Sequence, residues 1–133
     1  MKGTILVVDD EPDIRNLFTD TFVGEGYDVC TAENGEEAIE MLQKTGFDVV
    51  FLDLKLFGMN GIEACRKIRK KYPLAIIYAM TGWGALFEIE ECREAGFDDF
   101  FTKPLRRKVL SKALDDAFEK IARWQGRHGN LYC

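Results

Sequence analysis

The sequence contains few of the residues that build a disulfide framework or a zinc site. It has one histidine, His128, and four widely spaced cysteines with no C-x-x-C pair. Zinc sites need clustered cysteine and histidine ligands, which this spacing does not offer. Disulfides are rare in cytosolic proteins, and we expect the four cysteines to be reduced thiols: Cys30, Cys65, Cys92 and Cys133.

The sequence also lacks long hydrophobic runs and an excess of positive charge. Its longest apolar stretch, Leu74 to Met80, is far too short to cross a bilayer. Residues 1–4 lead directly into a predicted strand and leave no room for a signal peptide. A net charge of −5 argues against general affinity for nucleic acids. We therefore expect one cytoplasmic domain of 133 residues, with no membrane span and no direct nucleic-acid contacts.

Four short apolar runs in the chain each end on polar residues. Continuous apolar runs of this length are typical of strands that are buried on both faces of a parallel sheet. The carboxyl ends of parallel strands share one edge, where open α/β sheets bind ligands. We therefore expect the polar residues to converge there. The runs and the residues that follow them are 5–8 with Asp9 and Asp10, 49–52 with Asp53, 75–80 with Thr81, and 100–102 with Lys103 and Pro104.

Helical patterns alternate with these strands along the chain. Asn34 followed by Glu37, and Asn60 followed by Glu63, indicate the capped starts of two helices. Five strand–helix units predict a doubly wound α/β fold, in which five helices cover both faces of a five-stranded parallel sheet. The expected strands are 5–8, 27–32, 48–52, 75–80 and 99–102, and the expected helices begin near residues 12, 34, 60, 86 and 105, the last ending near Trp124.

The converging residues indicate a phosphoryl-transfer site. Three carboxylates at one edge repel each other and need a cation, and a ligand set of oxygens alone favours a hard metal such as Mg²⁺. Lys103 adds a compact positive charge that commonly pairs with phosphate, and Thr81 adds a hydroxyl. A simpler interpretation of residues 9–11 is that negative charge before a helix stabilises its dipole. The second strand-terminal aspartate, Asp53, makes that interpretation less favoured.

Four motifs, each at the end of a predicted strand, resemble those of the receiver domain of two-component response regulators. They are V-V-D-D at 7–10, L-D-L at 52–54 with M-N-G at 59–61, M-T-G at 80–82, and T-K-P-L at 102–105. The resemblance covers residues from about 3 to 122, so it implies a receiver domain over 1–122 and leaves 123–133 as a flexible C-terminal tail. It also implies a flavodoxin-like sheet with the strand order 2-1-3-4-5.

The resemblance assigns a role to each acidic residue. Asp53 would accept a phosphoryl group from a sensor histidine kinase or a phosphotransfer protein and form an acyl phosphate. Asp10, Asp53 and the backbone carbonyl of Lys55 would bind Mg²⁺, and Asp9 would act through metal-bound water. Such a protein would catalyse only its own phosphorylation and dephosphorylation, so it would not be an enzyme that turns over a separate substrate.

The resemblance also assigns phosphoryl-binding and switching roles. Lys103, the hydroxyl of Thr81 and the backbone of Gly82 would bind the phosphoryl oxygens. The Lys103–Pro104 bond would be cis. Phosphorylation would draw Thr81 inward and change the state of Phe100. The change would switch the binding of a downstream protein to the face that the fourth helix, fifth strand and fifth helix form.

Two aromatic side chains depart from the receiver pattern. Phe57, four residues after Asp53, stands where receivers usually have proline, and it would contact a partner or fold over the site. Trp83, two residues after Thr81, is unusually large for a position near a phosphoryl group. We hypothesise that Trp83 and Lys55 limit the access of water and slow the loss of the phosphoryl group.

Two other functions compete with the signalling receiver. A Mg²⁺-dependent phosphohydrolase would form the same aspartyl-phosphate, but such enzymes carry a general acid two residues after the nucleophile, where this chain has Lys55. A flavin-binding domain would need a loop rich in Ser, Thr and Gly after the first strand, and residues 9–11 are acidic instead. The receiver is the leading function, and the phosphohydrolase is the alternative.

Overall fold

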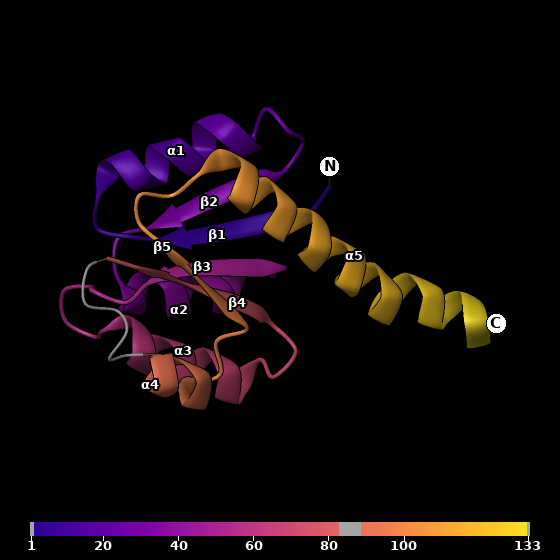
Figure 1. Cartoon of the computed structure of the whole chain (residues 1–133). Helices are drawn as coiled ribbons and strands as arrows, with labels where there is room; N and C mark the ends of the chain where they lie inside the picture. The colour runs from indigo at the N-terminus through magenta and orange to yellow at the C-terminus, as the bar shows by residue number, and fades with distance from the viewer. Residues whose placement is uncertain (1, 83–88, 133) are drawn as a thin grey trace.

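The chain folds around one parallel sheet of five strands in the order β2-β1-β3-β4-β5 (Figure 1). The computed structural model describes the backbone of residues 2–82 and 89–132, and within these ranges the side chains up to residue 125. The flavodoxin-like α/β fold predicted from the sequence is confirmed. The strands are β1 (Thr4–Val8), β2 (Asp28–Ala32), β3 (Val49–Asp53), β4 (Ile76–Thr81) and β5 (Asp99–Thr102); the helices are α1 (Pro12–Phe22), α2 (Gly35–Lys44), α3 (Gly61–Lys71), α4 (Ile89–Ala95) and α5 (Arg107–Tyr132).

Helices α2 and α3 begin after the two residues that the sequence predicts as caps. Asn34 Oδ1 accepts a hydrogen bond from the backbone N–H of Glu37 at 2.8 Å, and Asn60 Oδ1 accepts one from the N–H of Glu63 at 2.9 Å. Each bond satisfies one of the backbone donors that the start of a helix leaves unpaired. Helix α1 begins at Pro12, whose fixed φ suits the first helical position.

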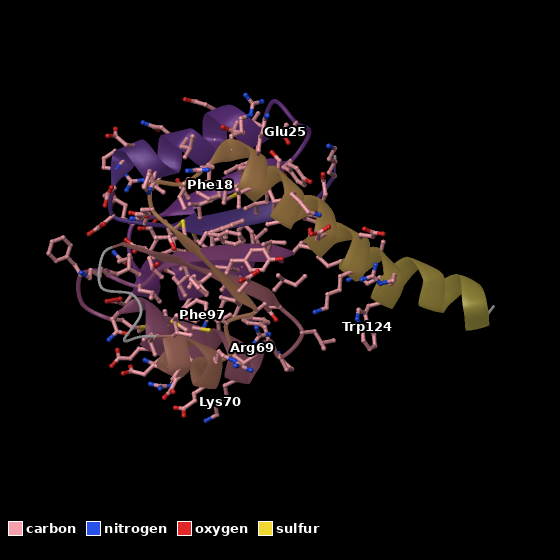
Figure 2. All side chains as sticks on the ribbon, in the orientation of Figure 1. Phe18, Glu25, Arg69, Lys70, Phe97 and Trp124 are labelled. Carbon is pink, nitrogen blue, oxygen red and sulfur yellow. The ribbon has the colours of Figure 1, made fainter. Side chains whose placement is uncertain are left out.

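The sheet separates two apolar layers. Successive residues of a strand point to opposite faces, so Ile5 and Val7 pack with α1 and α5, whereas Leu6 and Val8 pack with α2, α3 and α4 (Figure 1). Phe18 of α1, labelled in Figure 2, is fully buried, and its ring centroid lies 4.8 Å from that of Phe51 on β3. Because both faces are covered, the strands form a fixed platform for the residues that follow them.

One arginine ties the end of α3 to the starts of β4 and β5. Arg69, labelled in Figure 2, forms an ion pair of 2.9 Å with Asp98, the residue before β5. Its guanidinium also donates hydrogen bonds to the backbone carbonyls of Pro73, Ala75 and Gly96. These bonds satisfy carbonyl groups of the turns that follow α3 and α4. The side chain therefore fixes the amino-terminal edge of the sheet, opposite the strand ends that carry the polar residues.

Helix α5 is longer than the sequence predicts. It spans Arg107–Tyr132, and its last turns run past the sheet in Figure 1. The predicted end near Trp124 is therefore wrong. Gly126 and Gly129 each cost a helix about 1 kcal/mol, but no proline follows to break it. Whether residues 123–133 behave as a flexible tail stays a prediction.

Smaller differences concern the second strand and the fourth helix. Strand β2 begins at Asp28, one residue later than predicted. Leu86, which the sequence places near the start of the fourth helix, lies outside the described residues, and so does Trp83. Among the described helices, none combines the length and the apolar composition that a bilayer crossing requires.

Candidate functional site

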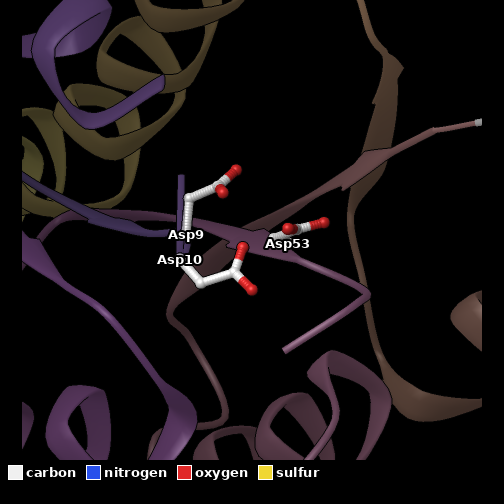
Figure 3. A group of neighbouring side chains, drawn as sticks. All are labelled: Asp9, Asp10 and Asp53. Carbon is white, nitrogen blue, oxygen red and sulfur yellow. The ribbon is translucent and has the colours of Figure 1, made fainter. Parts of the chain in front are cut away.

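Three aspartates meet at the carboxyl-terminal edge of the sheet (Figure 3). Asp9 and Asp10 follow β1, and Asp53 ends β3; one carboxylate oxygen of each lies within 4.8 Å of the others. The strands are paired in register from Val8 and Leu52 back toward their starts, so their ends reach the same level. The convergence that the apolar runs predict is therefore confirmed for the acidic residues.

Two of the aspartates are buried and held by their own loops. Asp9 is fully buried, and its Oδ1 accepts a hydrogen bond from the backbone N–H of Glu11 at 2.9 Å. Asp53 is nearly as buried, and its Oδ1 accepts one from the N–H of Lys55 at 3.3 Å. Asp10 is half-buried. The backbone thus orients one oxygen of each buried carboxylate and leaves the other toward the centre of the site.

Lys103 brings a positive charge to the buried carboxylates. Its Nζ lies 3.0 Å from Asp9 Oδ2 and 3.4 Å from Asp53 Oδ2, and 3.3 Å from the exposed Glu11 Oε1. The backbone N–H of Lys103 donates to the carbonyl of Thr81 at 2.7 Å, which joins the ends of β4 and β5. The Lys103–Pro104 peptide bond is cis, the isomer that the resemblance implies.

Burial and mutual repulsion make the buried carboxyl groups of this site weaker acids than surface carboxyl groups. Burial raises the pKa of Asp53 to about 6, and the charge of Asp9 acts in the same direction, against Lys103. Burial also raises the pKa of Asp9. Burial lowers the pKa of Lys103, but the surrounding carboxylates outweigh it and hold the value above its ordinary one. The negative charge in the site exceeds what one ammonium balances.

Two buried oxygens fit a bound cation and a bound anion. Asp9 Oδ2 pairs with the charge of Lys103 but accepts no hydrogen bond, and the hydroxyl of Thr81 has no hydrogen-bond partner among the described residues. Buried polar atoms in proteins rarely lack a hydrogen bond. Three clustered carboxylates with a spare acceptor suit a hard divalent cation. A hydroxyl without a partner and an ammonium, which end neighbouring strands, suit phosphoryl oxygens.

Two contacts in the site are not predicted from the sequence. Arg15 of α1 donates to the backbone carbonyl of Asp9 at 2.8 Å and pairs with Glu33 at 3.3 Å. Glu11, which the sequence suggests as a charge for the helix dipole, reaches Lys103. No pattern in the sequence distinguishes Arg15 from a solvent-facing arginine. The contact of Glu11 depends on two loops 92 residues apart.

The aromatic residues of the prediction lie at the surface or outside the described part. Phe57 is 81% exposed in the loop after β3, and Phe100 is 41% exposed on β5. Lys55 is exposed as well. Trp83 lies outside the described residues, so the hypothesis that it shields the site stays a prediction. Gly82 follows Thr81 at the end of β4 and is the last residue described before the gap at 83–88.

Residues 5–115 match the family model described as the response regulator receiver domain. The chain belongs to this family: it is a two-component receiver domain with an acidic metal site at its strand ends. The fold, the acidic cluster and Lys103 are thus the features of a domain whose family membership implies a phosphoacceptor. The resemblance found in the sequence motifs is confirmed.

Known proteins of several kinds contain similar domains. The chain is 36% identical over 86% of its length to a cyclic di-GMP phosphodiesterase of Thermotoga maritima, and it covers 30% of that protein. It is 30% identical to the chemotaxis protein CheY4 of Vibrio cholerae, with a TM-score of 0.82. That match covers 86% of this chain and 98% of CheY4. A BeF3-activated receiver domain of DrrB is 28% identical, with a TM-score of 0.81 over 90% of this chain and 99% of that one. The chain spans less than a third of the first curated relative.

Proposed function

We propose that the protein accepts a phosphoryl group on Asp53 in a Mg²⁺-dependent reaction in the cytoplasm. The donor is a sensor histidine kinase or a phosphotransfer protein. The observation that carries the proposal is the placement of Asp53, whose Oδ2 lies 3.4 Å from the ammonium of Lys103 and beside two further carboxylates. A buried carboxylate with a cation site and a phosphate-binding lysine beside it is equipped for phosphoryl transfer.

The transfer breaks one bond to phosphorus and forms another. A carboxylate oxygen of Asp53 attacks the phosphorus of a phosphohistidine and forms the O–P bond of an acyl phosphate, while the N–P bond breaks. The imidazole leaves with the electron pair of that bond and is protonated by water. Lys103 Nζ and the unpartnered hydroxyl of Thr81 then donate hydrogen bonds to the phosphoryl oxygens, with the backbone N–H of Gly82 as a further donor.

The acidic residues have two roles, binding the cation and accepting the phosphoryl group. Asp10, Asp53 and the backbone carbonyl of Lys55 would hold Mg²⁺, and Asp9 would contact it through water. The ion supplies positive charge to the carboxylates and to the transferred group. Because Asp53 and Asp9 repel each other in a buried site, their affinity for a cation should be high.

Phosphorylation switches the protein between two conformations. The added charge draws the hydroxyl of Thr81 toward the phosphoryl group, and Phe100, 41% exposed in this structure, moves inward to fill the space. A cavity of about 190 Å³ lies beside Phe100 and is lined by Ile89, Cys92 and Phe97. A downstream protein would read the change at the face of α4, β5 and α5.

Incubation with Mg²⁺ and acetyl phosphate, followed by intact mass measurement, tests this function. We expect one phosphoryl adduct on the native chain, none on Asp53→Asn and none when EDTA removes the metal. In this assay the P–O bond to acetate breaks and acetate leaves with the electron pair. An adduct that persists undiminished on Asp53→Asn would falsify the assignment. Steady release of many phosphates per chain would favour the phosphohydrolase instead.

A further inference from the structure

Glu11 takes part in the ion-pair cluster of Lys103 without any role in the acidic metal site. An ammonium group has three N–H donors, and three carboxylates surround the Nζ of Lys103: Asp9 at 3.0 Å, Glu11 at 3.3 Å and Asp53 at 3.4 Å. The ammonium donates hydrogen bonds to Glu11 and Asp53 and pairs with Asp9 by charge. A phosphoryl group on Asp53 would therefore compete with Glu11 for this ammonium.

The three carboxylates differ in how firmly they are held. The side chains of Asp9 and Asp53 are 0% and 6% exposed, whereas that of Glu11 is 59% exposed. The two aspartates accept hydrogen bonds from their own loops, so they fix the position of Lys103 by themselves. Glu11 is consequently the partner that Lys103 can give up at the smallest cost.

The backbone leaves the side chain of Glu11 available for this contact. Glu11 occupies the N-cap position of α1 with φ −87° and ψ 117°, but its side chain makes no capping hydrogen bond. Residues at this position usually turn their side chain onto the helix N–H groups. Here the side chain reaches across to Lys103 in the loop after β5, 92 residues away.

We infer that Glu11 is a positioning residue that competes with the phosphoryl group for Lys103 and so lowers the affinity of the site for that group. The inference rests on the proposed function of Asp53. Two effects act in the same direction. Glu11 occupies an N–H that the phosphoryl oxygens need, and its negative charge repels an incoming dianion across a short distance. Because Glu11 is largely exposed, solvent screens the effect and keeps it modest.

The inference is tested with beryllofluoride, a non-covalent substitute for the phosphoryl group, in the presence of Mg²⁺. The dissociation constant is measured from backbone amide shifts at low and high salt for the native chain and three variants. Glu11→Gln removes the charge and keeps the length. Glu11→Asp keeps the charge but shortens the reach. Asp13→Asn removes an exposed charge from the first turn of α1 and is the matched control.

We expect Glu11→Gln to tighten beryllofluoride binding roughly two- to fivefold at low salt, and less at high salt. Glu11→Asp should bind beryllofluoride with an affinity between those of the native chain and Glu11→Gln, because it keeps the charge but loses the reach to Lys103. Asp13→Asn should stay within about twofold of the native chain. The rate of phosphorylation by acetyl phosphate should rise in the same order.

Each other result overturns the inference. If Glu11→Gln binds beryllofluoride as tightly as the native chain, Glu11 has no effect on the affinity. If it binds more weakly, Glu11 raises the affinity. If Glu11→Asp behaves as the native chain, or Asp13→Asn as Glu11→Gln, then general surface charge explains the effect and the contact with Lys103 does not. A native chain that neither binds beryllofluoride nor forms an adduct on Asp53 overturns the proposed function itself, which separates the two failures.

Discussion

Gly61 packs against Asp53 so closely that a Cβ on the glycine would overlap the carbonyl oxygen of the aspartate. Gly61 is the first residue of α3, and its backbone N–H donates to the carbonyl of Leu54 at 3.1 Å. The atoms that a side chain would meet belong to the backbone and cannot rotate away. The start of α3 therefore sets where the main chain of Asp53, the proposed phosphoacceptor, lies.

Replacing Gly61 with alanine should displace the turn between β3 and α3. We expect Gly61→Ala to lower the free energy of unfolding by about 2 kcal/mol, as overpacking in a core does, and to slow the phosphorylation of Asp53. Urea unfolding and the acetyl phosphate assay measure the two effects. Gly46→Ala is the control, because a Cβ there meets nothing within 4 Å. Equal losses in both variants would contradict the prediction.

The raised pKa of Asp53 should make the metal-free protein less stable as the pH rises. Burial raises the pKa of Asp53 to about 6, whereas an unfolded aspartate titrates near pH 4. Between these values the folded state binds more protons, so the free energy of unfolding falls with increasing pH and then levels off above about pH 6. Asp53→Asn should therefore gain about 3 kcal/mol in free energy of unfolding at pH 7.5 and almost nothing at pH 4. Urea unfolding without divalent ions decides this, and an equal gain at both pH values would refute it.

Protons and divalent cations should compete for the same carboxylates. Since the pKa of Asp53 is about 6, Mg²⁺ binding should be nearly independent of pH above 7 and weaken below 6. The loss should approach roughly tenfold per pH unit, because one proton must leave when the ion binds. Titration calorimetry from pH 5 to about pH 8 measures the profile. In Asp53→Asn the affinity should be lower throughout and the step near pH 6 absent.

Loss of the Arg69 side chain should destabilise the fold without touching the site. Arg69→Met keeps much of the apolar stem but removes the donor of the carbonyls of Pro73, Ala75 and Gly96. It also removes the ion pair of Asp98, which keeps only its hydrogen bond from the N–H of Ile77. We expect a loss of about 2–4 kcal/mol in the free energy of unfolding, because several polar groups lose their partners at once. Beryllofluoride affinity should stay close to that of the native chain, since Arg69 lies at the opposite edge of the sheet.

Arg66→Met provides the matched control for Arg69→Met. Arg66 is exposed on the same helix, and substitutions at such positions usually change stability by less than about 0.5 kcal/mol. Chemical unfolding of both variants under identical conditions measures the difference. Comparable losses at the two positions would mean that the charge of α3, rather than the bonds of Arg69, stabilises the turns.

The sequence predicts the fold and the site to the extent that local patterns report them. The apolar runs before Asp9 and Asp53 indicate buried parallel strands, and Asn34 and Asn60 mark helix starts through bonds only three residues long. Such signals act over short distances along the chain. The family motifs then supply the strand order and the roles, which periodicity alone cannot give.

Contacts between distant loops are the part that the sequence does not predict. Glu11 meets Lys103, and Arg69 meets Asp98, only because the fold brings segments that are far apart in the chain together at an edge of the sheet. A charged residue in a loop has the same local pattern whether it faces solvent or a partner. The end of α5 is missed for a different reason: Gly126 and Gly129 weaken a helix by amounts that the rest of a long helix can absorb.

Because α5 is long, a small tilt at the sheet produces a larger displacement at its far end. From the buried Leu110 to Tyr132 the helix rises about 33 Å at 1.5 Å per residue. A tilt of about 5° at the sheet would therefore carry the far end through roughly 3 Å. Small movements of β5 and its loop would thus be enlarged, and given a direction, at the far end of this helix.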